Sequence, residues 1–299
     1  MPPFSAGAVR LGTAIITATM MPRGEGGNIN GPSLIRAPDW LPGRLGTYYL
    51  YFAHHSGTSI RLAIADRLEG PWRIHAGGTL QLADATGAHG HVASPDVHVD
   101  EAGRRIVMAF HGPARGHRRQ LSFLAQSADG LSFTARPDPI AGFYLRLVPW
   151  RGGWVGMSKG GVMYQGGALD GPFKRRWRPA FPMTGRDANG PGDVRHVALS
   201  ADGDTLTVYF SRIGDAPERI LAADIDLSRY FWRAGPAREV LRPEEQWEGV
   251  SLPVVTSRAG AADGPEHALR DPAIFRENGR TYLIYAAAGE SGLGIARFD

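Results

Sequence analysis

The sequence has no cysteine and very little lysine. Without cysteine, disulfide bonds and thiolate metal sites are excluded over all 299 residues. Lys159 and Lys174 are the only lysines among 33 basic residues, and the arginines are scattered, so the net charge of +4 does not mark a basic patch. The densest run, residues 174–178, is interpreted as a solvated loop. We therefore expect no nucleic-acid partner.

Long apolar runs are also absent. No stretch approaches the roughly 18 apolar residues that a membrane helix needs. The apolar segment at residues 11–18 is too short and too rich in threonine for a signal sequence, and it is more typical of a β-strand. We expect no membrane partner. The expected compartment is the cytoplasm, or the periplasm if a signal has been trimmed.

What the sequence does contain is turn-forming residues and enough apolar residues for a core. It has 40 glycines and 22 prolines, and 43% of its residues are hydrophobic. No interval is polar and repetitive enough to serve as a linker between domains. We therefore predict one domain that spans residues 1–299.

An internal repeat organises the chain. Five segments share a strand pattern rich in aromatic and β-branched residues, at Tyr48–His55, Arg105–Gly112, Gly153–Gly160, Leu206–Asp215 and Thr281–Glu290. Each follows a turn and an earlier apolar strand, and each precedes a third strand. The turns include Asp202-Gly203-Asp204 and Glu277-Asn278-Gly279.

Three strands with a weaker fourth, repeated five times, predict an all-β, five-bladed β-propeller. The last interval is longer because an insertion at about residues 240–265 precedes the fifth blade. That blade lacks an outer strand of its own. We expect the N-terminal strand, around residues 9–18, to supply it and close the ring.

The polar residues gather on one predicted face. The innermost strand of each blade begins there, and the loop between the second and third strands returns to it. The opposite face carries ordinary turn formers. On the first face we expect the substrate-binding residues Asn30, His54, His55, His91, Arg195, His196, Arg212, Asp215, Arg219, Arg270 and Glu290. For Arg212–Arg219, the alternatives are a grip on a substrate carboxylate or sulfate and an internal network that stiffens a loop.

Three carboxylates are the predicted catalytic residues. Asp96 and Asp271 lie beside prolines at strand starts, and Glu248 lies within the insertion. An Asp beside Pro can also be a plain turn residue. The functional reading is a pair of carboxylates around a sugar ring, one protonated as acid and another ionised as base or nucleophile.

We expect no cofactor to be required. The candidate for a bound ion is a structural calcium in the central channel, with water as the alternative, held by His91 or His196. No tight metal-ligand spacing accompanies these histidines.

The blade layout and the motifs SPDV at 94–97, SRIGDAPERI at 211–220 and RDPAIF at 270–275 are similar to those of the five-bladed propeller glycosidases. These are glycoside hydrolase family 43 and the related families 32, 68 and 130. The likeness is strongest to family 43-like bacterial proteins and covers nearly the whole chain. It implies the propeller fold and a carbohydrate substrate.

The motifs depart from the family pattern at the catalytic positions. The start of blade one reads Asn28-Ile29-Asn30 where family 43 enzymes place their base Asp, and Glu248 comes later than their acid Glu. Three functions therefore remain open. The first is a glycoside hydrolase that acts on a small glycan, either neutral or acidic. The second is a polysaccharide lyase or glycoside phosphorylase, and the third is a carbohydrate-binding propeller without catalytic activity.

Overall fold

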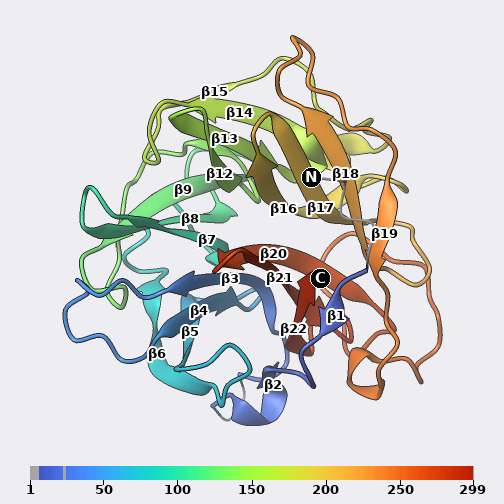
Figure 1. Ribbon diagram of the computed structural model, residues 1–299, viewed down its shortest axis with the longest axis horizontal. Helices are drawn as coiled ribbons and strands as arrows, with labels where there is room; N and C mark the ends of the chain where they lie inside the picture. The colour runs from blue at the N-terminus through green and yellow to red at the C-terminus, as the bar shows by residue number, and fades with distance from the viewer. Residues whose placement is uncertain (1–6, 23–24, 299) are drawn as a thin grey trace.

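Five small antiparallel sheets surround a central axis in the computed structural model, which describes residues 7–22 and 25–298 (Figure 1). Blade I contains β3 (Asn30–Arg36), β4 (Tyr48–Ala53), β5 (Ser59–Ala65) and β6 (Arg73–Gln81). Blade II contains β7 (Ala93–Asp100), β8 (Arg105–Pro113), β9 (Gln120–Ser127), β10 (Thr134–Ala135) and β11 (Ala141–Gly142). These sheets confirm the predicted five-bladed propeller.

The other three blades follow the same plan. Blade III contains β12 (Arg146–Trp150), β13 (Gly153–Ser158), β14 (Val162–Gly166) and β15 (Phe173–Arg175). Blade IV contains β16 (Val194–Asp202), β17 (Thr205–Arg212), β18 (Ile220–Asp226) and β19 (Arg238–Leu241). Blade V contains β20 (Leu269–Glu277), β21 (Arg280–Ala287) and β22 (Gly292–Phe298). The insertion before blade V starts slightly later in the chain than predicted, because residues 240 and 241 belong to β19.

The N-terminal segment completes blade V, as predicted. β1 (Val9–Arg10) and β2 (Ile16–Thr17) both pair antiparallel with β22. In this register Val9 lies opposite Arg297, so the two ends of the described chain share one sheet. Figure 1 shows β1 beside β22 at the outer side of this blade.

The strands read as continuous apolar runs because each sheet is covered on both faces by its neighbours. Side chains alternate between the faces of a strand. In β4, Tyr49 and Tyr51 pack in the cluster shared with blade II. Tyr48, Leu50 and Phe52 of the same strand pack in the cluster shared with blade V. One such apolar cluster fills each of the five seams between blades.

Helical structure is confined to short turns. Within the described residues the helices are 3₁₀ turns, η1 (Ala18–Met20), η2 (Lys159–Gly161), η3 (Arg186–Ala188) and η4 (Gln246–Glu248). Over the same residues, no helix has the length and apolar character needed to cross a membrane.

Candidate active site

The innermost strands β3, β7, β12, β16 and β20 line the axis and begin on one face, called the top face below (Figure 1). Four of them carry a register shift near their start, between Asn30 and Ser33, Ala93 and Asp96, Val194 and Val197, and Arg270 and Ala273. Bulges of this kind re-aim side chains at the rims of sheets. Here they define two successive levels of residues around the axis.

The upper ring consists of four residues at the bulges, Gly31, Ser94, Arg195 and Asp271, and of Tyr144, which stands two residues before β12. Four of them have positive φ angles, 56° at Gly31, 47° at Ser94, 61° at Tyr144 and 50° at Asp271. Glycine adopts this conformation freely, whereas other residues are strained in it. Strain of this kind concentrates at functional sites. Gly31, Ser94, His196 and Asp271 lie close together. They come from the four segments expected to converge at the axis, residues 28–31, 91–96, 193–196 and 267–271.

Asp271 is the carboxylate of the upper ring, and its side chain is almost fully buried. Its Oδ1 pairs with Nδ1 of His196, and its Oδ2 accepts the Gly31 N–H at 3.0 Å. Burial by itself would raise the pKa of Asp271, but His196, Arg270 and the Gly31 N–H outweigh it and lower this pKa. Asp271 is therefore ionised near neutral pH.

His196 of blade IV contacts Asp271, and Tyr144, just before blade III, packs against His196. The Tyr144 and His196 rings meet edge to face, with centroids 4.1 Å apart. Burial lowers the pKa of His196, and the attraction of Asp271 opposes this. Burial also raises the pKa of Tyr144, and the charges of Asp271 and Glu290 raise it further. The charges of both Asp271 and Glu290 therefore act on the pKa of His196 and on the pKa of Tyr144.

Glu290 lies beside this group, in the loop between β21 and β22. Its Oε2 accepts hydrogen bonds from the side-chain amides of Asn28 and Asn30, at 3.1 Å for Asn30. His55 also faces it, with Nδ1 3.9 Å from the same oxygen, and donates its backbone N–H to Asn28 Oδ1 at 2.8 Å. The Asn-rich start of blade I therefore holds a carboxylate supplied by blade V.

A buried ion network supports the site from blades IV and V. Glu218 Oε1 pairs with Arg195 Nε at 2.9 Å, and Glu218 Oε2 pairs with Arg270 Nη2 at 2.9 Å. Arg270 Nη1 lies 3.5 Å from Glu290 Oε1. Ser211 and Ser257 donate hydroxyl hydrogen bonds to Glu218 at 2.7 and 2.8 Å. The two arginines are thus neutralised from within the protein.

Several buried polar atoms of this group make no hydrogen bond within the described chain. They include Asn30 Oδ1, His111 Nδ1 and Arg270 Nε. His111 packs against Tyr144, with ring centroids 4.3 Å apart, and burial keeps its pKa well below the usual value. Unsatisfied buried polar groups are rare in proteins and indicate a place for a polar ligand or water.

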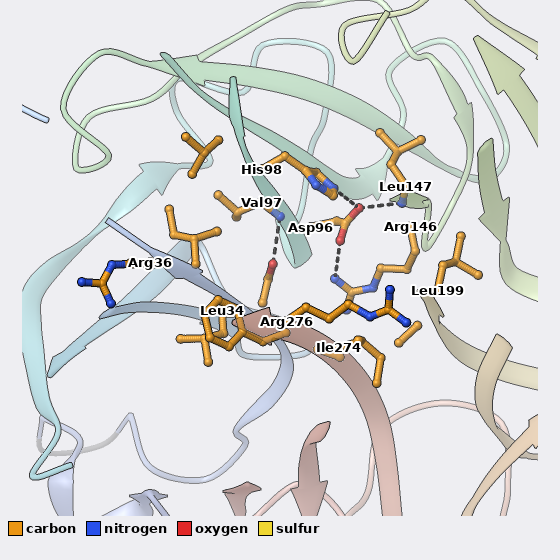
Figure 2. Close-up of a pocket in the computed structure, with 16 residues that line it drawn as sticks. Leu34, Arg36, Asp96, Val97, His98, Arg146, Leu147, Leu199, Ile274 and Arg276 are labelled. Atoms are coloured by element: carbon orange, nitrogen blue, oxygen red, sulfur yellow. Dashed lines mark hydrogen bonds and ion pairs between the residues drawn. The ribbon is translucent and has the colours of Figure 1, made fainter. Parts of the chain in front are cut away.

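Asp96 lies one level lower, in a ring formed by Ser33, Asp96, Arg146, Val197 and Ala273. Its Oδ2 accepts the Leu147 N–H at 2.7 Å, just as Ser33 Oγ accepts the Val97 N–H at 2.9 Å. Figure 2 shows Asp96 with His98 and Arg146 in a cavity of roughly 300 Å³ that Arg36 and Arg276 also line, at the opposite end of the axis. The structure therefore does not bring Asp96 to the upper ring.

Glu248 is held away from the axis, against the edge of blade V. Arg10 donates to both of its oxygens at 2.8 and 2.7 Å, and the Tyr285 hydroxyl donates at 2.8 Å. Its Oε2 also accepts the backbone N–H groups of Glu244 and Glu245. With its side chain fully buried and both oxygens occupied, Glu248 caps η4 and anchors β1.

We expect Glu248→Gln to lower the free energy of unfolding by about 3 kcal/mol, because it leaves Arg10 without its buried partner. The turnover of the molecules that remain folded should stay unchanged. Denaturant unfolding followed by tryptophan fluorescence, with activity normalised to folded protein, checks both. A loss of turnover without a loss of stability would instead support the sequence-based prediction that Glu248 is catalytic.

The remaining predicted residues divide between the site and its surroundings. His91 lies near the upper ring, where Nε2 is 3.1 Å from Gln120 Oε1. His54 turns back on its own loop and accepts the Ser56 N–H at 3.0 Å. Arg219 binds Glu239 on β19 at 2.9 Å, and Asp215 lies 3.7 Å from Arg219, while Arg212 packs over Phe210. Arg219 and Asp215 thus form the internal network that was the alternative for this stretch.

The channel below the upper ring holds an arginine. The Arg146 guanidinium donates to the carbonyl oxygens of Pro95 and Pro32, at 3.4 Å for Pro32. Within residues 7–22 and 25–298, no group of three or more His, Asp or Glu side chains could hold a metal ion. His196 and His91, the proposed ligands, instead pair with Asp271 and Gln120.

Sequence reasoning did not select Tyr144, His111 or Glu218 as site residues. Glu218 lies in a top-face loop where the repeat places site residues, and His111 lies near the top-face end of β8. Tyr144 could have been found by register, because it stands two residues before Arg146, as Ser94 stands two before Asp96 and Gly31 two before Ser33. Aromatic residues in such positions resemble ordinary core residues, which hides them in a sequence.

Solved structures of several glycosidases share this fold. A member of the GH130 family of mannoside phosphorylases and glycoside hydrolases superimposes with a TM-score of 0.66 at 12% identity, over 99% of this chain and 95% of that one. CoXyl43, a GH43 β-xylosidase/α-arabinofuranosidase from a compost microbial metagenome, gives 0.61 at 12% identity, over 97% and 94%. The GH43_1 enzyme of Xanthomonas citri gives 0.60 at 14% identity, over 95% and 90%. At these identities the likeness establishes the fold.

No protein-family model matches the sequence. The uncharacterized protein R118 of Acanthamoeba polyphaga mimivirus is 36% identical over 90% of this chain and 83% of its own length. The chain belongs to the family of that viral protein.

Proposed function

We propose that this protein is a glycoside hydrolase whose reaction takes place at the upper ring. The observation that carries the proposal is that two buried carboxylates, Asp271 and Glu290, lie near enough to His196 and Tyr144 at the top-face end of the axis to shift the pKa of both. Two carboxylates with different surroundings are the basic equipment for cleaving a glycosidic bond. The fold shared with glycosidases and glycoside phosphorylases supports this choice.

In this proposal Asp271 is the ionised member. A glycosidic transition state develops positive charge on the sugar ring, and an ionised carboxylate beside it lowers the barrier. His196 and the Gly31 N–H hold the Asp271 side chain in one orientation. Asp271 can therefore act as nucleophile or as the base that activates water.

Glu290 is the proposed proton donor. The two asparagine amides occupy its Oε2, and its Oε1 receives no hydrogen bond within the described chain. Arg270 Nη1 lies 3.5 Å from this oxygen, which we propose as the one that carries the proton for the leaving group. Asn30 Oδ1 and His111 Nδ1 remain available to sugar hydroxyl groups.

Hydrolysis fits these residues better than phosphorolysis. A phosphate ion at the upper ring itself would have to be held by Arg195 or Arg270, and both guanidinium groups are already paired with Glu218. Turnover of aryl glycosides and oligosaccharides, measured with and without inorganic phosphate, tests the proposal. Turnover that does not depend on phosphate supports a hydrolase, and strict dependence on phosphate indicates a phosphorylase. Sugar binding without any turnover indicates a binding propeller.

A further inference from the structure

A cationic pocket opens on the top face beside the upper ring, between blades II and III. Its volume is roughly 510 Å³. Phe143 and Tyr164 contribute aromatic walls, and Arg119, Lys159 and Arg175 contribute positive charge. Among its lining residues, Asp187 alone carries a carboxylate. Three cations against one anion favour a negatively charged ligand.

Lys159 is the most enclosed cation of this pocket. Its Nζ lies 5.1 Å from the centroid of the Phe143 ring and hydrogen-bonds the side-chain oxygen of Asn189. In the described part of the chain, no carboxylate forms an ion pair with it. Burial, together with the nearby charge of Arg195, lowers the pKa of Lys159 to about 8, against the opposing effect of Asp193 and Asp187. A partly desolvated ammonium without a counter-ion binds an anion more strongly than an exposed one.

The outer wall of the pocket is a loop fixed in an unusual conformation. Asp193 accepts the backbone N–H groups of Thr184, Gly185 and Gly190, at 2.6, 2.9 and 2.7 Å. Asp187 and Ala188, in the same loop, have φ angles of +53° and +55°. Two consecutive non-glycine residues in this region are strained, and proteins retain such strain mainly at ligand-binding loops.

Residues that line the pocket pack against residues beside the upper ring. The Phe143 ring lies 5.0 Å from the Tyr144 ring and 5.7 Å from the His111 ring. On the other side, Gln120 lines the pocket and contacts His91. Phe143 and Gln120 thus connect the lining of the pocket to the upper ring.

We infer that this pocket binds a sugar unit that carries an anionic group, a carboxylate or a sulfate ester, next to the bond that is cleaved. The Lys159 ammonium contacts the anionic group, while Arg119 and Arg175 contribute positive charge at the rim. Phe143 and Tyr164 pack against the sugar ring. The inference rests on the proposed function, because it places the cleaved bond at Asp271.

Titration calorimetry with three disaccharides tests the inference: digalacturonate, a sulfated disaccharide, and neutral galactobiose. We expect the wild-type protein to bind one or both anionic ligands at least about 10-fold more tightly than galactobiose, since a hydrogen bond to a charged group is worth that much. Lys159→Met should remove this preference and leave galactobiose binding unchanged. Lys159→Arg should restore it.

The second lysine provides a matched control. Lys174 lies on β15 outside the lining of this pocket, so Lys174→Met makes the same change of charge and should leave all three affinities unchanged. A preference for digalacturonate alone identifies a uronate, and a preference for the sulfated ligand alone identifies a sulfate ester. Equal affinity of the wild type for all three ligands, or an equal effect of Lys159→Met on each, would overturn the inference.

The pH dependence gives an independent readout. Lys159 is charged below a pH of about 8 and neutral above it, so the preference for the anionic ligand should be complete near pH 6.5 and decline as pH rises through 8. Lys159→Arg should keep the preference across this range, because arginine stays protonated. Selective binding without turnover would refute the proposed hydrolase and leave the pocket assignment standing. Turnover that depends neither on an anionic group in the substrate nor on Lys159 would refute the pocket assignment and leave the proposed hydrolase standing.

Discussion

Asp271→Asn should lower the turnover of any glycoside substrate by about 10²–10⁴-fold while the protein stays folded. The asparagine oxygen can still accept the Gly31 N–H, so the local backbone keeps its support. The negative charge beside the sugar ring is lost, and the transition state loses its stabilisation. Steady-state kinetics on the best substrate from the glycoside screen, with circular dichroism on the same samples, measures both effects.

Asp204→Asn is the matched control. Asp204 lies in the turn between β16 and β17 on the bottom face, where it binds Arg151 at 2.8 Å. The same chemical change there should leave turnover unaffected. Full activity of Asp271→Asn would contradict the proposal that the reaction takes place at the upper ring.

Glu218→Ala should lower the free energy of unfolding by about 3–5 kcal/mol, the cost of leaving buried charges without their partner. Glu218 is fully buried and satisfies Arg195, Arg270 and two serine hydroxyls. Its removal takes away the carboxylate partner of Arg195 in the interior of the top face and leaves Arg270 to Glu266 and Glu290. Urea unfolding of the purified variant measures the effect.

Glu266→Ala is the control that removes a partly exposed ion-pair partner of Arg270 in place of a fully buried one. Glu266 binds the same Arg270 at 2.6 Å, but its side chain is 29% exposed. An ion pair open to solvent contributes about 1 kcal/mol or less, so this variant should unfold almost like the wild type. Similar small effects in both variants would show that the network does not stabilise the fold.

The repeat made the fold predictable from the sequence. Strands buried on both faces read as apolar runs, and five such runs with matching turns fit a closed ring of blades. The closing strand was also predictable, because blade V visibly lacked an outer strand. Asp271, Arg270 and His196 followed from the rule that strand starts share one face. Glu290 followed from the rule that the loop between the second and third strands returns to that face.

The level of a residue along the axis was harder to predict. The prolines of Gly31-Pro32, Ser94-Pro95 and Asp271-Pro272 occupy equivalent places, so Asp271 precedes its proline and Asp96 follows its own. That difference of two residues moves Asp96 from the upper ring to the lower one. Aligning the prolines, and not the acidic residues, would have shown it.

Glu248 could not be placed from sequence for a different reason. Its position depends on Arg10, which lies 238 residues away and reaches it only because the N-terminal strand closes blade V. Irregular insertions carry no periodicity that would fix their direction. Likewise, nothing near Arg146 in the sequence indicates that its side chain turns into the channel.

The pairing of Val9 with Arg297 also sets the order in which the parts of this protein can fold. Contacts so distant in the chain are slow to form, because the intervening polypeptide must first become ordered. During synthesis the N-terminal strand has to wait, with its backbone unpaired, until the final strand has left the ribosome. Blades I to IV can assemble earlier, but the seams on both sides of blade V stay open until that moment. Apolar side chains in these seams make the unfinished ring prone to aggregation, and a chaperone would act at that stage.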